Sequence, residues 1–112
     1  MSVVFKLLRL DEFQAFNSTS EYYGSADDIR DGFVHLSTAR QLPGTLARHF
    51  AGDNELVLLA FDDVDLGGAL KWEPSRDGAL FPHVYGALPV EKAMAEHRLT
   101  RRPNGVMELP EL

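Results

Sequence analysis

Cysteine is absent from this sequence of 112 residues. Disulfides, thiolate metal sites and cysteine nucleophiles are therefore excluded. Long apolar runs are also missing, and Lys6 and Arg9 interrupt the apolar start MSVVFKLLRL. Because this start has neither a long apolar core nor a small-residue cleavage site, we predict a first strand there rather than a signal peptide. We expect a cytoplasmic protein with no membrane partner.

Positive charge is scarce. The chain has 11 Lys and Arg residues against 17 Asp and Glu residues, which gives a net charge of −6 and a pI near 5.1. Nonspecific binding to a phosphate backbone needs a positive surface, so a nucleic-acid partner is not expected. The exception would be a local basic patch at Arg98, Arg101 and Arg102, although short runs of this kind more often form a solvated edge.

Several catalytic and metal-binding signatures are missing as well. The sequence contains no phosphate-cradling glycine loop and no Gly-x-Ser-x-Gly elbow. The carboxylates of Asp62, Asp63 and Asp65 lack the loop length and terminal glutamate of a calcium-binding hand. His35 and His83 do not have the compact spacing of metal ligands. We therefore expect no metal cofactor.

The composition is that of an ordinary globular protein, with 45% hydrophobic and 25% charged residues. We predict one domain over residues 1–112, because no linker or internal repeat divides the chain. The predicted strands cover residues 3–9, 32–38, 55–61, 70–73 and 81–88, with 55–61 at the centre of a sheet, and a closing hairpin joins 98–102 to 106–109.

Predicted helices are short. One begins at Asp11, one follows a Thr38/Gln41 capping box and reaches Phe50 after an interruption at Pro43, and one covers residues 90–97. Residues 18–31 and 62–68 are predicted to be loop and turn. Since several connections are too short for parallel crossovers, the fold class is α+β, with mixed, largely antiparallel sheets and short helices.

Two of the predicted strands carry the same pattern of side chains. Alternation along a strand puts Phe33, His35 and Ser37 on one face, and Phe81, His83 and Tyr85 on one face of another strand. If these faces meet, they form a hollow with imidazoles, hydroxyls and aromatic rings, which suits a nucleotide-like small molecule. The alternative is that each histidine is half-buried and hydrogen-bonded within its sheet.

A second candidate site is Trp72-Glu73 together with Arg76. A glutamate beside the single tryptophan could act as an acid or base if buried, or could orient a sugar hydroxyl if ionised. The alternative is a surface ion pair between Glu73 and Arg76 around a turn, which would contribute little.

The same segments carry a resemblance to a known family. Five blocks match: DGFVHLSTA with Gln41, HFAG, LVLL, LKWEPSR and FPHVYG. Over residues 3–88 the chain resembles domain-of-unknown-function family 952, a small bacterial family. One departure is Phe13, where the family often has tryptophan, and this is an exchange of one core-type residue for another.

The resemblance implies a fold like that of the ADP-ribosyltransferase superfamily. In that superfamily a strand histidine holds a ribose of NAD, an aromatic residue stacks on nicotinamide, and a glutamate supports an oxocarbenium-like centre. The resemblance assigns the ribose contact to His35, the stacking to Tyr85 and an additional hydrogen bond to His83. The carboxylate would be Glu73, or Glu108 on the last predicted strand.

Three hypotheses follow. The first is an NAD- or nucleotide-handling transferase or glycohydrolase with NAD as substrate. The second is a binding module for a nucleotide-like ligand without catalysis, and the third is a protein-interaction domain whose aromatic residues are core. In the first, a carboxylate in a water-poor pocket would stabilise the positive charge that develops on the sugar.

Overall fold

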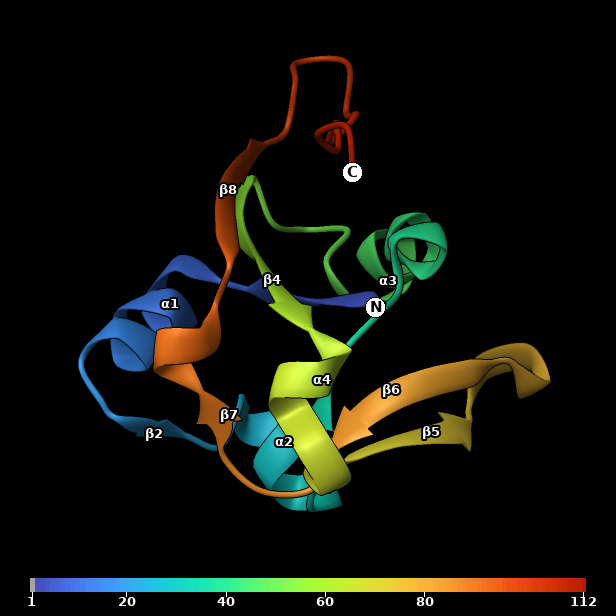
Figure 1. Ribbon diagram of the computed structural model, residues 1–112. Helices are drawn as coiled ribbons and strands as arrows, with labels where there is room; N and C mark the ends of the chain where they lie inside the picture. Colours follow the sequence, from blue (N-terminus) through green and yellow to red (C-terminus); the bar gives the residue numbers. More distant parts are fainter. Residues whose placement is uncertain (1) are drawn as a thin grey trace.

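The computed structural model describes residues 2–112, apart from the side chain of Arg76. Its largest sheet contains β1 (Val3–Leu8), β4 (Glu55–Asp62) and β8 (Ala95–Thr100) in the order β1-β4-β8, with both pairings antiparallel (Figure 1). The apolar run of β4 is central, as predicted. The apolar side chains of β4 alternate between two buried clusters, because helices and loops cover both faces of this sheet.

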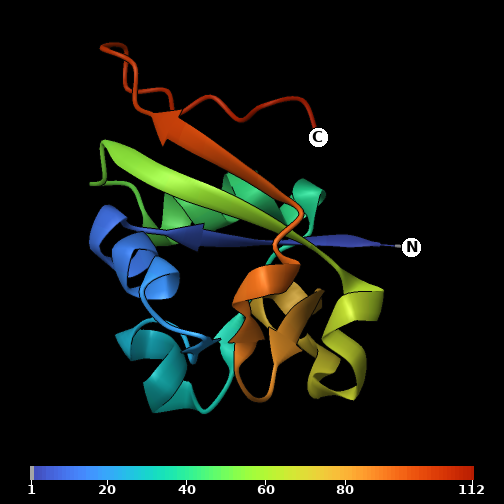
Figure 2. The ribbon, with the colours of Figure 1, turned by 60° about the vertical axis from the view of Figure 1, so that its left-hand side comes forward.

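A second antiparallel sheet has the order β3-β6-β5, from β3 (Val34–His35), β6 (Leu80–Val84) and β5 (Leu70–Pro74). A small ribbon pairs β2 (Glu21–Tyr22) with β7 (Leu88–Pro89). These two sheets lie on the same side of the β1-β4-β8 sheet (Figures 1 and 2). The prediction of an α+β fold with antiparallel sheets and short helices is confirmed.

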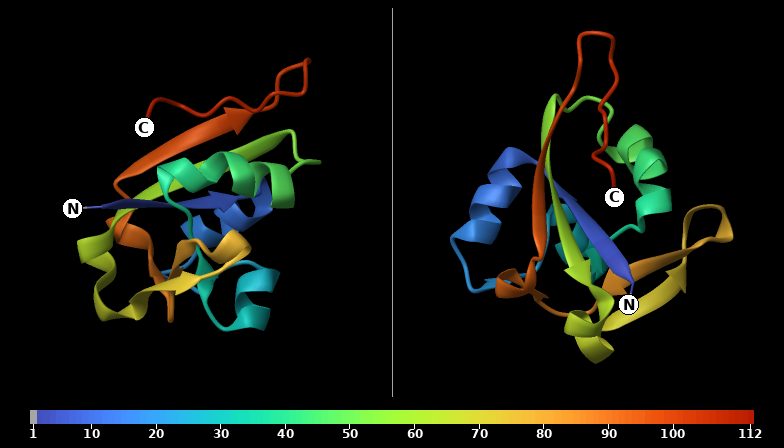
Figure 3. Two further views of the ribbon diagram at one scale, coloured as in Figure 1. Left: turned by 90° about the vertical axis from the view of Figure 1, so that its right-hand side faces the viewer. Right: turned by 45° about the horizontal axis from the view of Figure 1, so that its top comes forward.

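The helices are short and fill the spaces between the sheets. They are α1 (Leu10–Asn17), α2 (Ala26–Asp31), α3 (Leu42–His49) and α4 (Asp63–Leu66), with 3-10 turns at Ala39–Gln41, Gly67–Ala69, Arg76–Gly78 and Val90–Lys92. In the left view of Figure 3, α3 lies alongside the larger sheet, and α2 and the β5–β6 hairpin lie below it.

The Thr38/Gln41 capping box is confirmed. Thr38 Oγ1 accepts from the Gln41 N–H at 3.3 Å, and Gln41 Oε1 accepts from the Thr38 N–H at 3.0 Å. The 3-10 turn that follows runs directly into α3. The prediction that Pro43 interrupts the helix is wrong. Pro43 lies in the first turn of α3, where a backbone N–H has no partner within the helix, so a proline there removes no helical hydrogen bond.

The prediction of a helix over residues 90–97 is wrong. Only Val90–Lys92 form a helical turn, and Ala95–Thr100 form β8 against the free edge of β4. Leu99 is buried there opposite Leu56. The edge of the most apolar strand gains a full row of backbone hydrogen bonds, and this tertiary pairing overrides the local helical preference.

The segments predicted to be loops contain regular structure. Residues 18–31 include β2 and α2, and residues 62–68 include α4. Ser25 begins α2 with a capping box, in which its Oγ accepts from the Asp28 N–H at 3.3 Å and Asp28 Oδ2 accepts from the Ser25 N–H at 2.9 Å. The first helix also differs from its prediction, because Glu12 caps it by accepting from the Arg9 N–H and Asp11 lies inside it.

Candidate functional site

The histidines of the two predicted strands are direct partners across the β3–β6 pair. Val34 lies opposite Val84 and His35 lies opposite His83. Val34 and Val84 face the core on one side, so both imidazoles project from the other side, with ring centroids 5.4 Å apart. Alternation along the strand therefore places the residues as the sequence predicted, although β3 is shorter than predicted.

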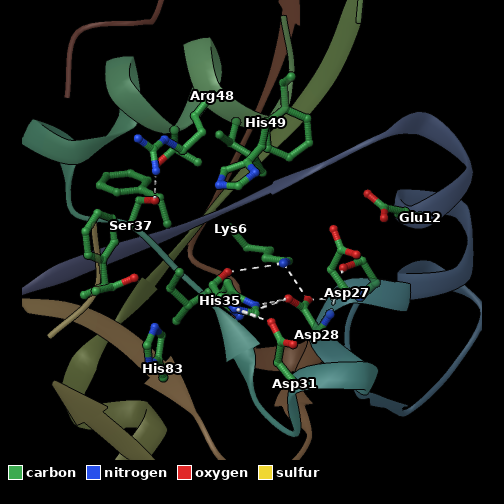
Figure 4. A pocket seen from close by; sticks show the side chains of 18 of the residues that line it. Lys6, Glu12, Asp27, Asp28, Asp31, His35, Ser37, Arg48, His49 and His83 are labelled. Carbon is green, nitrogen blue, oxygen red and sulfur yellow. Dashed lines mark hydrogen bonds and ion pairs between the residues drawn. The ribbon is translucent and has the colours of Figure 1, made fainter. Parts of the chain in front are cut away.

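Both imidazoles line a cleft of about 370 Å³. Its walls come from β1, the first turns of α1, α2, the C-terminal part of α3 and the β5–β6 hairpin (Figure 4). Ser37 and Phe81, from the same two predicted strand segments, also line it. This volume is within the usual range of small-molecule sites, roughly 300–1,000 Å³.

Lys6 was not among the predicted site residues, and it lies at the centre of the polar network. Its ammonium group is 2.6 Å from Asp28 Oδ2, and the two side chains are only 7% and 2% exposed. Lys6 Nζ also donates to the His35 carbonyl at 3.2 Å. Lys6 shares one face of a short strand with the core residues Val4 and Leu8, and this is the sequence signal that could have revealed it.

Asp28 connects Lys6 to His35. Its Oδ1 is 2.6 Å from His35 Nδ1 and also accepts from the His35 backbone N–H. Burial alone would raise the pKa of Asp28, but the hydrogen bond with His35 and the charge of Lys6 outweigh it and hold this pKa well below its usual range. Asp28 is therefore ionised, so His35 Nδ1 carries the proton of this hydrogen bond.

The other nitrogen of His35 is also engaged. Nε2 lies 3.1 Å from Asp31 Oδ2, one helical turn after Asp28. Asp31 Oδ1 in turn accepts from Arg30 Nε at 3.2 Å. Carboxylates of α2 thus lie beside both ring nitrogens of His35, so a ligand would reach the half-exposed edge of this ring only beside Asp31.

His83 has a different arrangement. The side chain is 6% exposed and its Nδ1 is 2.8 Å from Glu73 Oε1. Hydrogen bonds from His83 and from the Tyr85 hydroxyl lower the pKa of Glu73, so Glu73 is an ionised acceptor and Nδ1 is the donor. In the neutral form of the ring, the Nε2 lone pair has no hydrogen-bond partner among the residues that the structure describes. His83 therefore presents an unengaged proton acceptor at the cleft.

Phe33, Tyr85 and Glu73 are predicted site residues that lie outside the lining of the cleft. Phe33 stacks on the His83 ring at a centroid distance of 4.1 Å, with an interplanar angle of 24°. Tyr85 packs 5.2 Å from Phe33 and donates to Glu73, and this hydrogen bond raises the pKa of the Tyr85 phenol. Glu73 therefore acts on the cleft only through His83.

Trp72 and Arg76 are the remaining predicted residues. Trp72 is paired with Pro82, so it projects from the sheet face opposite His83 and Glu73, and it is 40% exposed. Neighbouring residues of a strand cannot share a face, which separates Trp72 from Glu73. The structure does not describe the side chain of Arg76, so the alternative of a Glu73–Arg76 ion pair is not tested. Glu108 pairs with Arg102 near the C-terminus and does not line the cleft.

The remaining polar lining comes from α1 and α3. Ser37 Oγ and Thr45 Oγ1 are 3.0 Å apart, and Arg48 and His49 follow on the last turn of α3. Arg9 Nε binds both carboxylate oxygens of Asp53 at 3.2 Å, and its guanidinium lies 4.7 Å from the centroid of Phe50. In the described part of the chain, no group of three or more His, Asp or Glu side chains is placed to hold a metal ion.

The arginines near the C-terminus are engaged locally. Arg98 pairs with Glu55 and Arg102 with Glu108. Arg101 donates to the backbone carbonyls of Asp53, Phe50 and Gly105. These contacts hold the turn that follows β8 against the N-terminal end of β4. No helix in the described chain combines the length and the apolar character needed to cross a membrane.

Comparison with known families gives one match, to the family described as "Protein of unknown function (DUF952)", over residues 7–96. The chain belongs to this family. No curated protein matches it. The DUF952 segment covers β1 from Leu7 onward, the whole cleft apart from Phe5 and Lys6, and the start of β8.

Solved structures support the fold of this DUF952 protein. The crystal structure of protein CC0527 from Caulobacter crescentus is 41% identical, with a TM-score of 0.89 over 96% of this chain and 94% of that chain. A crystal structure of a double mutant of CC0527 gives 40% identity and the same TM-score and coverage. The solution NMR structure of CC0527 gives 42% identity and a TM-score of 0.81 over 94% and 90% of the two chains.

Proposed function

We propose that this protein binds a nucleotide-like small molecule in the cleft and acts on it as a transferase or glycohydrolase of the ADP-ribosyltransferase-like kind, with NAD as the candidate substrate. The observation that carries the proposal is the cross-strand pair of His35 and His83 at a polar cleft of about 370 Å³. Hydroxyls, imidazoles and an exposed guanidinium, that of Arg48, in one hollow are the groups that recognise sugars and phosphates.

His83 is the proposed proton acceptor. Glu73 fixes its tautomer through Nδ1, which leaves Nε2 for a ligand proton. A carboxylate behind an imidazole also stabilises the ring once it is protonated. Glu73 therefore acts as a positioning residue, and Phe33 holds the ring plane by stacking.

We propose that His35 forms, beside His83, part of the cleft wall that contacts the ligand. The carboxylates of Asp28 and Asp31 hold its ring, and Asp31 is 35% exposed at its edge. A sugar hydroxyl could donate to Asp31 there. In the glycohydrolase hypothesis, Asp31 is also a carboxylate in the cleft that can face a developing positive charge, a role for which the family resemblance offered Glu73 or Glu108.

The alternative is a binding module without catalysis. One observation favours it: carboxylates of this chain lie within 3.1 Å of both ring nitrogens of His35, which is the arrangement of a structural histidine. Under this alternative the same ligands bind and no bond is broken.

The test combines binding and turnover. Calorimetry with NAD, ADP-ribose and nicotinamide measures binding, and chromatography measures nicotinamide released from NAD. Replacing a general base typically lowers rates by about 100-fold or more, so we expect His83→Ala to lower nicotinamide release by that factor. His97→Ala is the matched control, because His97 lies on β8 away from the cleft lining.

The outcomes separate the hypotheses. Binding with no nicotinamide release by the unchanged protein would support the module. Equal loss of activity in the His83 and His97 variants would contradict the role of His83. If none of the three compounds gives heat on titration, the proposal of a nucleotide-like ligand is wrong.

A further inference from the structure

The cations that line the cleft differ in whether a carboxylate neutralises them. Four cations and four carboxylates line it. Lys6 is neutralised by buried Asp28, and Arg9 by Asp53. Arg30 pairs with both Asp27 and Asp31.

Arg48 is the exception among these cations. It lies on the last turn of α3 and is exposed at the rim of the cleft. No ion pair or hydrogen bond engages its guanidinium in the described part of the chain. An unengaged guanidinium keeps its five donors for a planar, doubly hydrogen-bonded contact with an anion.

Further polar groups adjoin Arg48 on the same side. Thr45 lies almost one helical turn before Arg48, and its hydroxyl donates to the Gln41 carbonyl at 3.2 Å and accepts from the Ser37 hydroxyl at 3.0 Å, so these two side chains order the wall beside Arg48. His49 lines the cleft next to Arg48. Figure 4 shows Arg48, His49 and Ser37 around one end of the cleft, beyond Lys6.

The carboxylates occupy the opposite end. Glu12 comes from α1, and Asp27 and Asp31 from α2, and Figure 4 shows them across Lys6 from Arg48. Like charges repel most strongly where water is partly excluded, so an anionic ligand group is disfavoured at that end. Hydroxyl or amine donors suit it instead.

We propose that Arg48, with His49 beside it, forms an anion subsite that binds a phosphate or carboxylate group of the ligand. This inference rests on the proposed function, because it assigns one end of the same cleft. The ligand class that follows is a compound with an anionic group at one end and hydroxyl or amine donors at the other. The acidic chain thus uses an unpaired arginine to admit an anion where its net charge of −6 would otherwise oppose it.

The experiment is an NMR titration of the ¹⁵N-labelled protein with inorganic phosphate, ADP-ribose and uncharged adenosine. We expect phosphate and ADP-ribose to shift the backbone amides of Ser37, Thr45, Arg48 and His49. Arg48→Gln should weaken both by about ten-fold, since a charge-assisted bidentate contact is lost. Arg98→Gln is the matched control, because it removes the same charge from an exposed arginine on β8 and should change both affinities less than two-fold.

Salt dependence gives a second readout. The affinity of the unchanged protein for ADP-ribose should fall as sodium chloride is raised, and the fall should be smaller in the Arg48→Gln variant. Carboxylate and phosphate ligands are distinguished by repeating the titration with acetate.

Two results would overturn the inference. If ADP-ribose shifts cleft amides but the Arg48 and Arg98 variants bind it equally, the subsite is wrong and the proposed function stands. If none of the three probes shifts a cleft amide, and NAD gives no heat, the subsite and the proposed function both fail.

Discussion

At the scale of single residues, Asp28 connects the fold to the cleft. Its carboxylate accepts from Lys6, from the Ser25 backbone and from the His35 backbone and ring. A buried ion pair is costly to form, but removing one partner leaves the other charge uncompensated. The network therefore fixes the position of β1, α2 and His35 relative to one another.

Asp28→Asn should lower the free energy of unfolding by about 3–5 kcal/mol, because Lys6 keeps a buried charge without a counterion. Asp27→Asn is the matched control on the same helix. Its carboxylate is 68% exposed and pairs only with Arg30, so its loss should cost less than about 1 kcal/mol. Urea denaturation followed by circular dichroism measures both, and similar values for the two variants would refute the argument.

The pH dependence of the same variant provides an independent check. The pKa of folded Asp28 lies below the ordinary value of 3.8, so the unfolded chain takes up this proton first as the pH falls. The stabilisation that ionised Asp28 provides is therefore complete at pH values above this ordinary pKa. It is lost as the pH falls from the ordinary pKa toward the lower pKa of the folded state. The unfolding free energy of the unchanged protein should fall below about pH 5, and that of Asp28→Asn should fall less steeply. Parallel profiles would show that Asp28 is not responsible.

At the scale of elements, glycines set the entry to and the exit from α2. Gly24 has φ +104°, and a Cβ there would overlap the Asp28 side chain. Gly32 ends the helix with φ +86° in open space. The first glycine is needed for close approach as well as for conformation, and the second for conformation alone.

Alanine substitutions should separate these requirements. Gly32→Ala should cost about 1 kcal/mol from the left-handed conformation, and Gly24→Ala about 3 kcal/mol because steric overlap is added. Gly52, with open space and no positive φ, is the control and should change stability by less than about 1 kcal/mol. Thermal unfolding of the three variants gives the order, and equal losses at Gly24 and Gly32 would contradict the overlap.

At the scale of the whole molecule, β4 joins two hydrophobic clusters. Leu59 lies in the cluster shared with the β3-β6-β5 sheet, and Leu58 in the cluster beneath α3. Both side chains are almost fully buried, at 1% and 0% exposure. Since one strand contributes to both clusters, neither can be lost without disturbing the other.

Leu58→Ala and Leu59→Ala should each lower the free energy of unfolding by about 2–5 kcal/mol. Each variant should still unfold in a single transition, because the clusters share β4. Calorimetry and circular dichroism provide the measurement. Two separate transitions in either variant would show that the clusters unfold independently.

Local sequence patterns were enough to predict the periodic features of this protein. The apolar run of β4, the Thr38/Gln41 capping box and the alternation that places His35 and His83 opposite the core all follow from local spacing. The Ser25/Asp28 capping box was also present as a local signal for α2.

Which of these local features contact one another depends on long-range packing and is seen in the tertiary structure. Residues 95–100 form a strand because β4 offers a free edge, and no local pattern contains that information. Lys6, Arg48 and the carboxylates of α1 and α2 reach one cleft although they are far apart in the chain. The strand pairing likewise puts Trp72 and Glu73 on opposite faces and makes Glu73 the partner of His83. Periodicity fixes the face that a side chain occupies, whereas its neighbours depend on long-range packing, and for that reason the cleft was visible only in part from the sequence.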